Sequence, residues 1–201
     1  RMDQTAQAFV PLLDYWHAQN PRKRNIYAGL FTSKLPAPGV ETKNAWPPEE
    51  ITNQITAVRS RAPGSGHVHF SMVALVQNRL GLAETLKAQT YAGPTLVPAS
   101  PWLEDGSPDA PLANLTLRSD GDLELTLATA LTSKPVARWA LWLRYGDQWE
   151  FRVSGQTTVT LAAAGGQADR APLSAIVVSA LDRVGNESAR TGLEPLSGGM
   201  P

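Results

Sequence analysis

Two regions of the chain differ in the spacing of their apolar residues. In the first, apolar residues recur at intervals of three and four, which predicts amphipathic helices, and two short runs with few charges predict buried strands, the first of them buried on both faces. We expect helices at 4–20, from Pro47 to a stop at 62–64, and from Met72 to Leu86, with strands at 25–33 and 67–71. Pro11 indicates a break or a late start in the first helix. This alternation of helix and strand is typical of a parallel α/β layer.

Beyond about residue 112 the period changes to two, as in strands with one face against a core. The alternating residues form groups separated by turn residues: Leu115 and Leu117; Leu123, Leu125 and Leu127; Trp139, Leu141 and Leu143; Trp149, Phe151 and Val153; Val159 and Leu161; Ile176, Val178 and Ala180. About seven short strands of this kind predict an antiparallel sandwich.

These patterns predict two domains joined by a linker. We assign 1–98 to the α/β domain, 99–111 to the linker, 112–195 to the sandwich and 196–201 to a tail. Two parallel strands leave sheet edges unpaired and strand faces uncovered. We therefore expect the first domain to be incomplete, so that either the rest of a longer protein or self-association into a homo-oligomer covers it.

Composition narrows the function only slightly. The 18 basic and 18 acidic residues give a net charge of +0, so no general field attracts nucleic acid or an anionic membrane. With no cysteine, disulfides and thiolate zinc sites are excluded. No apolar run follows Arg1 that could be a signal peptide or a membrane span, so we expect any targeting segment to lie upstream.

Several ordered motifs carry a family resemblance. They are Tyr27-Ala28-Gly29-Leu30-Phe31-Thr32-Ser33, Trp46-Pro47, Gly66-His67-Val68-His69-Phe70-Ser71-Met72 and Tyr91-Ala92-Gly93-Pro94. This half of the chain resembles the last quarter of the barrel in family ten of the bacterial glycosyl-hydrolase-like lipoproteins, which includes peptidoglycan glycosidases acting on peptide-free glycan. The run 178–188 resembles a fibronectin type III module. The implied fold class is α/β plus all-β: the C-terminal fragment of a (β/α)8 TIM barrel, containing its seventh and eighth strands, followed by a fibronectin- or Ig-like sandwich.

The resemblance implies the C-terminal portion of a glycoside hydrolase acting on peptidoglycan or a related polysaccharide. In the full-length protein it implies a place in the cell envelope, as a periplasmic or outer-membrane lipoprotein. Most glycosidases need two carboxyl groups, and the strand ends carry Thr32-Ser33-Lys34 and Ser71-Met72 with no Asp or Glu. We therefore expect no catalytic residue and no cofactor here, and an inactive chain when it is alone.

The chain could instead contribute to a substrate cleft. We name as candidate substrate contacts Thr32, Ser33 and Ser71 for their hydroxyls, Trp46 and Trp142 for stacking, and His69 near a strand end. Each has a structural alternative: the hydroxyls can cap turns, Trp46 can fix the entry of a helix, and Trp142 can pack against the first domain.

His67 and His69 alternate onto one face of a strand, a spacing that could present two imidazoles to a metal. A metal needs more ligands than these, so we predict no metal site and expect hydrogen-bonded histidines lining the barrel interior. Two other functions stay open: a non-catalytic module that binds carbohydrate or cell wall, and a structural interaction module.

Overall fold

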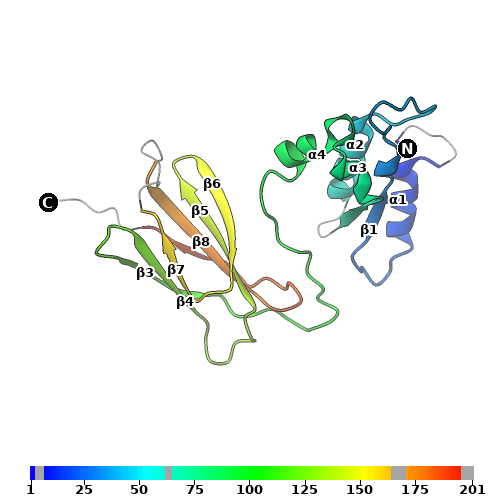
Figure 1. The fold of residues 1–201 in the computed structure, drawn as a ribbon. Coiled ribbons are helices and arrows are strands. Elements are labelled where there is room, and N and C mark those ends of the chain that lie inside the picture. The colour runs from blue at the N-terminus through cyan, green and yellow to red at the C-terminus, as the bar shows by residue number, and fades with distance from the viewer. Residues whose placement is uncertain (3–6, 62–64, 164–170, 196–201) are drawn as a thin grey trace. The chain divides into compact units, whose positions relative to one another are not determined.

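The structure is a computed structural model that describes residues 1–2, 7–61, 65–163 and 171–195. It divides into two compact units, Arg1–Gly93 (unit 1) and Pro94–Pro201 (unit 2), and Figure 1 labels most of their helices and strands. The predicted tail 196–201 lies outside the described residues. Within the described ranges, every helix is too short or too polar to cross a bilayer.

Unit 1 contains two strands and several helical segments (Figure 1): α1 (Phe9–Ala18), β1 (Tyr27–Leu30), η1 (Thr32–Lys34), α2 (Pro48–Arg61), β2 (Gly66–His69), α3 (Met72–Val76), η2 (Arg79–Gly81), α4 (Leu82–Thr85) and η3 (Leu86–Thr90). Pro11 lies in the first turn of α1, where a proline costs no helical hydrogen bond, so the helix starts late instead of breaking. The acidic first turn and basic last turn of α2 match its dipole.

The two strands of unit 1 run parallel, with Ala28 opposite His67 and Leu30 opposite His69. Ala28 and Leu30 pack on the helices, in a core that also contains Leu35, Ile51, Ile55, Leu82 and Leu86. On the opposite face, side chains such as Tyr27, Val68 and Phe70 are exposed. The prediction that the first strand is buried on both faces is therefore wrong, because the described helices cover one side of the sheet only.

Unit 2 consists of two antiparallel sheets. One has the strand order β3-β4-β7, from Leu112–Leu117, Leu123–Ala128 and Thr158–Leu161. The other has the order β6-β5-β8-β9, from Gln148–Ser154, Arg138–Tyr145, Leu173–Leu181 and Thr191–Leu193. Inward-facing side chains of both sheets share one core, composed of Leu123, Leu125, Leu127, Trp139, Leu141, Leu143, Tyr145, Leu161, Leu173, Ile176, Val178 and Ala180.

The segment 94–111 belongs to unit 2 and packs along the loop between β8 and β9. Ser100 N–H donates to Val184 O, and the Asn186 amide donates to Glu104 O and Gly106 O. Gly185 has φ +83°, and a Cβ there would lie 3.3 Å from Ala99 Cα, so both the backbone angle and the close approach require glycine. This contact fixes the segment to the second sheet.

The predicted fold class is wrong. Among the described residues, two strands are parallel and seven are antiparallel, so the chain is mainly β. The repeated strand-helix alternation of a TIM barrel is absent from the described part of the chain. The physical reason is that eight parallel strands are needed to close such a barrel, and the helix-strand pattern of unit 1 supplies two.

Candidate functional site

The carboxyl ends of β1 and β2 meet at one edge of the small sheet, because the strands are parallel and in register. Ser33 follows β1 in η1, and Ser71 follows β2. Their hydroxyl oxygens are 3.1 Å apart, and Ser71 N–H donates to Ser33 Oγ at 3.0 Å. Ser33 N–H in turn donates to Phe70 O. Two predicted contacts are thus brought together, and both are half-buried.

Thr32 is the predicted contact that lies deepest in the protein. Its side chain is fully buried, at 0% exposure, and its hydroxyl donates to Ser71 O at 3.1 Å. The hydroxyl of Thr32 therefore holds the Ser71 backbone in this structure. Arg79 holds the same turn from the other side by donating to Leu35 O at 2.9 Å.

Three aromatic rings stand beside these hydroxyls. The ring centroids of Phe31 and Trp46 are 6.2 Å apart in an edge-to-face arrangement, and those of Phe31 and Phe70 are 5.7 Å apart. Phe31 and Phe70 are 46% and 63% exposed, whereas Trp46 is half-buried against the core. We call Phe31, Ser33, Trp46, Phe70 and Ser71 the strand-end cluster.

Sequence reasoning missed Phe31 and Phe70. The available signal was their position: each directly follows the last residue of a strand and directly precedes a hydroxyl residue, Thr32 or Ser71. Strand alternation places such a residue on the face opposite Leu30 and His69. No helix within the described ranges covers that face, so the rings are exposed.

His69 does not join the strand-end cluster. It shares the helix-covered side of the sheet with Leu30, which is its register partner. There His69 Nε2 lies 2.8 Å from the Tyr91 hydroxyl, and His67 Nε2 hydrogen-bonds the same oxygen. The prediction of histidines lining a barrel interior is therefore wrong, although they are hydrogen-bonded as expected.

The histidine environment favours neutral imidazoles. Burial, followed by the charges of His69 and Arg59, lowers the pKa of His67 to about 4. Burial also lowers the pKa of His69 and raises that of Tyr91. The described residues contain no group of three or more His, Cys, Asp or Glu side chains arranged to hold a metal ion. The pair therefore forms a structural hydrogen-bond link to Tyr91.

Trp142 lies in unit 2, on the face of the four-stranded sheet that points away from the core. It is half-buried, its ring centroid is 5.1 Å from that of Phe151, and the guanidinium carbon of Arg190 lies 3.9 Å from the ring centroid. The Trp142 ring is therefore partly covered by Arg190 and Phe151.

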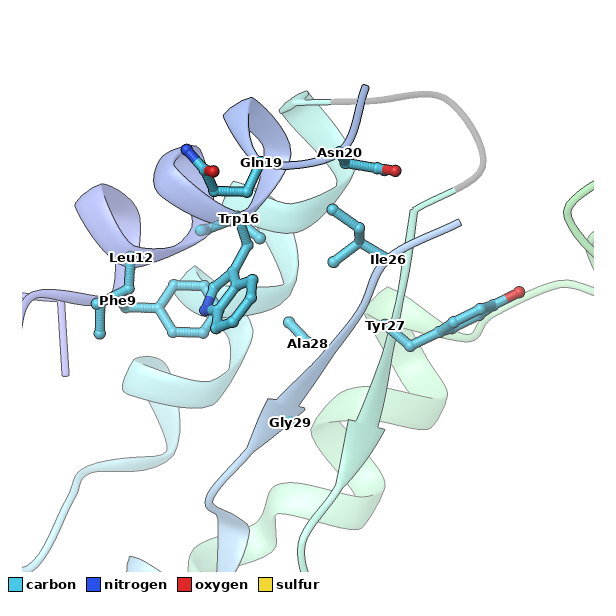
Figure 2. A pocket seen from close by; sticks show the side chains of 10 residues that line it. Phe9, Leu12, Trp16, Gln19, Asn20, Ile26, Tyr27, Ala28 and Gly29 are labelled. Atoms are coloured by element: carbon cyan, nitrogen blue, oxygen red, sulfur yellow. The ribbon is translucent and has the colours of Figure 1, made fainter. Parts of the chain in front are cut away.

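A separate pocket of about 530 Å³ opens between α1 and β1 (Figure 2). Figure 2 shows Phe9, Leu12 and Trp16 of α1 facing Ala28 of β1, with Tyr27 turned to the opposite side of the strand. The lining residues include no carboxylate and no histidine. The pocket therefore has apolar contact surface and no acid or base for catalysis.

Comparison with known proteins finds a relative with a named activity. "Glycosyl hydrolase YngK" of Bacillus subtilis (strain 168) is 33% identical over 124 residues, which are 59% of this chain and 23% of that protein. The chain thus covers less than a quarter of that relative. No family model matches. Among solved structures, the Clostridium perfringens spore cortex lytic enzyme SleM aligns with 12% identity and a TM-score of 0.31, over 92% of this chain and 74% of that one; similarity at this level carries no argument.

Part of the chain is therefore similar in sequence to a glycosyl hydrolase. This agrees with the broad resemblance seen in the sequence.

Proposed function

We propose that this chain is part of a larger glycoside hydrolase of the glycosyl-hydrolase-like family ten and that the strand-end cluster contacts the glycan substrate. The carrying observation is the gathering of three aromatic rings and two hydroxyls at the carboxyl ends of two parallel strands. The similarity to a glycosyl hydrolase supports the same assignment. Peptidoglycan glycan is the proposed substrate, and the cell envelope is the proposed location.

The chemistry of the cluster suits a sugar ring. The C–H groups on one face of a pyranose are apolar and are attracted to the negative face of an aromatic ring. Phe31 and Phe70 offer such rings with nearly half or more of each side chain exposed. The hydroxyls of Ser33 and Ser71 point to the same edge of the sheet and can exchange hydrogen bonds with sugar hydroxyls.

Hydrolysis needs groups that the cluster does not contain. None of its five residues is acidic, whereas glycosidases mostly use one carboxyl as acid and a second as nucleophile or base. We propose that both carboxyls belong to another part of the longer protein. This chain alone then binds glycan and does not cleave it.

Co-sedimentation with insoluble, peptide-free peptidoglycan glycan tests this proposal. The protein is measured in pellet and supernatant by gel, and released saccharides are measured by mass spectrometry. We expect the chain in the pellet, no released saccharide, and a severalfold weaker binding for Phe70→Ala. Tyr15→Ala is the matched control, because Tyr15 is an equally exposed aromatic on α1, outside the cluster.

Equal binding by Phe70→Ala and Tyr15→Ala would remove the cluster from the glycan contact. Release of saccharides by this chain would overturn the proposal that both catalytic carboxyls belong to another part of the longer protein. Hydrolysis by a longer protein, lost when Phe70 is replaced, would support the assignment from the enzymatic side.

Self-association is the second candidate, favoured by the uncovered apolar surface of unit 1. Tyr27, Val68 and Phe70 are exposed on one face of the sheet, and the pocket of Figure 2 is open beside β1. Apolar surface of this kind is usually buried by a partner. Light scattering over a range of concentrations tests it: a rising mass supports a homo-oligomer, and a constant monomer mass excludes it.

A further inference from the structure

Strand β1 has one edge with which no described residue pairs. On its other edge, Gly66 N–H of β2 donates to Ile26 O. In a parallel pair, every second residue turns both its N–H and its C=O toward the partner strand, so Ala28 also points to β2. The N–H and C=O groups of Tyr27 and Gly29 therefore point to the free edge. An unpaired edge of this kind is a template for another strand.

The pocket between α1 and β1 lies directly beside this free edge. The consecutive residues 26–29 of β1 form one wall of the pocket and residues of α1 form the other, around a volume of about 530 Å³ (Figure 2). Leu12 and Trp16 of α1 are 46% and 61% exposed. A Cβ on Gly29 would meet no described heavy atom within 4 Å, its chain neighbours aside. The free edge is thus bordered by open space and by apolar side chains of α1.

The path of the chain indicates which strand fits at this edge. Phe9 of α1 packs in the same core as Leu30 of β1 and as Ile51 and Ile55 of α2, so both helices cover the same face of the sheet. The path β1–α2–β2 joins two parallel strands through a helix, and such connections are right-handed in almost all proteins. A strand that continues through α1 into β1 with the same hand lies on the side of β1 opposite to β2. That side is the free edge.

We propose that the free edge of β1 binds a third parallel strand, which directly precedes α1 in the longer glycoside hydrolase. The N–H groups of Tyr27 and Gly29 donate to this strand, and their carbonyls accept from it. Its side chains on the helix-covered face enter the pocket beside Leu12 and Trp16, so we expect them to be apolar.

This inference rests on the proposed function, because that function places most of the protein outside this chain. The matched region covers 23% of the similar glycosyl hydrolase. A preceding segment of the same polypeptide is therefore the occupant that we choose for the edge, and a second copy of this chain is the competing one.

Hydrogen–deuterium exchange at single-residue resolution tests the pairing in this chain and in the longer protein. In this chain, the amides of Tyr27 and Gly29 should exchange on the order of tenfold faster than those of Ala28 and Leu30, which point to β2. In the longer protein, all four amides should exchange slowly.

Two proline variants test the same edge through stability. Gly29→Pro removes an N–H from the free edge, whereas Ala28→Pro, the matched control, removes an N–H that points to β2. Gly29→Pro should not lower the thermal midpoint of unit 1 in this chain, and it should lower the midpoint of the longer protein by several degrees. Ala28→Pro should lower both midpoints.

Fast exchange of the Tyr27 and Gly29 amides in the longer protein overturns the inference, and so does a Gly29→Pro variant that lowers neither midpoint. Slow exchange in this chain that depends on its concentration assigns the edge to a second copy and also overturns it. Neither measurement involves glycan. Protected edge amides without co-sedimentation would keep the added strand and remove the glycan contact, whereas co-sedimentation with unprotected edge amides would do the reverse.

Discussion

The two units of this protein bury their sheets to different extents. In unit 2, the inward sides of two sheets meet, and residues such as Leu141 and Val178 are completely buried. In unit 1, helices cover one side of a two-stranded sheet, while Tyr27, Val68 and Phe70 stand exposed on the other. A strand of unit 2 therefore gains stability from its core face, whereas a strand of unit 1 leaves one apolar face for contacts outside the described structure.

The difference separates residues that hold the fold from residues that are free to bind. Both units expose apolar side chains that the core does not use: Phe31 and Phe70, the proposed glycan contacts, in unit 1, and Trp149 and Val153 in unit 2. Removing such a side chain should affect binding more than stability. Removing a core side chain should do the reverse.

The largest expected effect is therefore that of a core truncation in unit 2. Leu141→Ala should lower the free energy of unfolding by about 3 kcal/mol, because it leaves a cavity between the two sheets. Phe70→Ala should change it by less than about 0.5 kcal/mol. Urea denaturation followed by tryptophan fluorescence measures both, and similar losses would contradict the comparison.

A smaller loss is expected where the segment 94–111 is attached to unit 2. Asn186 is buried and donates to Glu104 O, Gly106 O and the Asp182 carboxylate. Asn186→Ala removes the bonds to the two carbonyls, while the Asp182 carboxylate still accepts from the N–H groups of Val184 and residue 186, and the change should cost about 2 kcal/mol. Limited proteolysis should then cut within 94–111 faster than in the unchanged chain; an unchanged cleavage rate would show that the amide does not hold the segment.

In unit 1 a single methyl group tests the packing on the uncovered face. A Cβ on Gly66 would lie 2.5 Å from the Tyr27 ring, so Gly66→Ala should cost about 1.5 kcal/mol by displacing that ring. The cost should nearly vanish in a Tyr27→Ala background. Urea denaturation of the four chains of this double-mutant cycle measures the coupling, and an equal cost in both backgrounds would contradict the contact.

The smallest expected effect is a pH dependence confined to unit 1, which contains all three histidines of the chain. The pKa of folded His67 is about 4, below its unfolded value of 6.5, and burial lowers that of His69 as well. Their contribution is complete above pH 6.5 and is lost as the pH falls toward 4, because the unfolded state then binds more protons. Solvent screening of these half-exposed rings limits it to about 1 kcal/mol.

Urea unfolding at pH 7.5 and pH 5, followed by NMR signals of Gly29 for unit 1 and Ala140 for unit 2, measures this. The Gly29 transition should move to lower urea at pH 5, with a smaller shift in the double variant His67→Gln, His69→Gln. An equal shift of both transitions in every chain would assign the effect to other groups.

The spacing of apolar residues predicted the helices and strands well. It did not predict which face of the small sheet in unit 1 is buried. The helix predicted from Pro47 is α2, which starts one residue later at Pro48, and the alternation of Leu123, Leu125 and Leu127 predicted β4. The apolar run ending at Phe31 did not reveal which side of β1 the helices cover. The spacing of apolar residues predicts whether one segment is a strand or a helix. Which face of a strand is buried depends on the helices that pack against it, and the strand's own residues do not specify them.

The candidate site was predictable in part for the same reason. Ser33 and Ser71 follow parallel strands, so their meeting could be predicted, and the structure places their oxygens 3.1 Å apart. The burial of Thr32 and the exposure of Phe70 depend on packing from segments distant in the sequence. His69 lies on the helix-covered side because it is the register partner of the buried Leu30.

The sequence by itself determined the helices and strands, the change of period near residue 112 and the absence of acidic residues at the strand ends, because each of these depends only on residues close together in the sequence. Only the tertiary structure decided that the chain is mainly β, that Arg190 covers Trp142, and that Trp149 faces away from the core. Those outcomes depend on which strands pair and in what register, since a register fixes the side of the sheet on which every side chain lies.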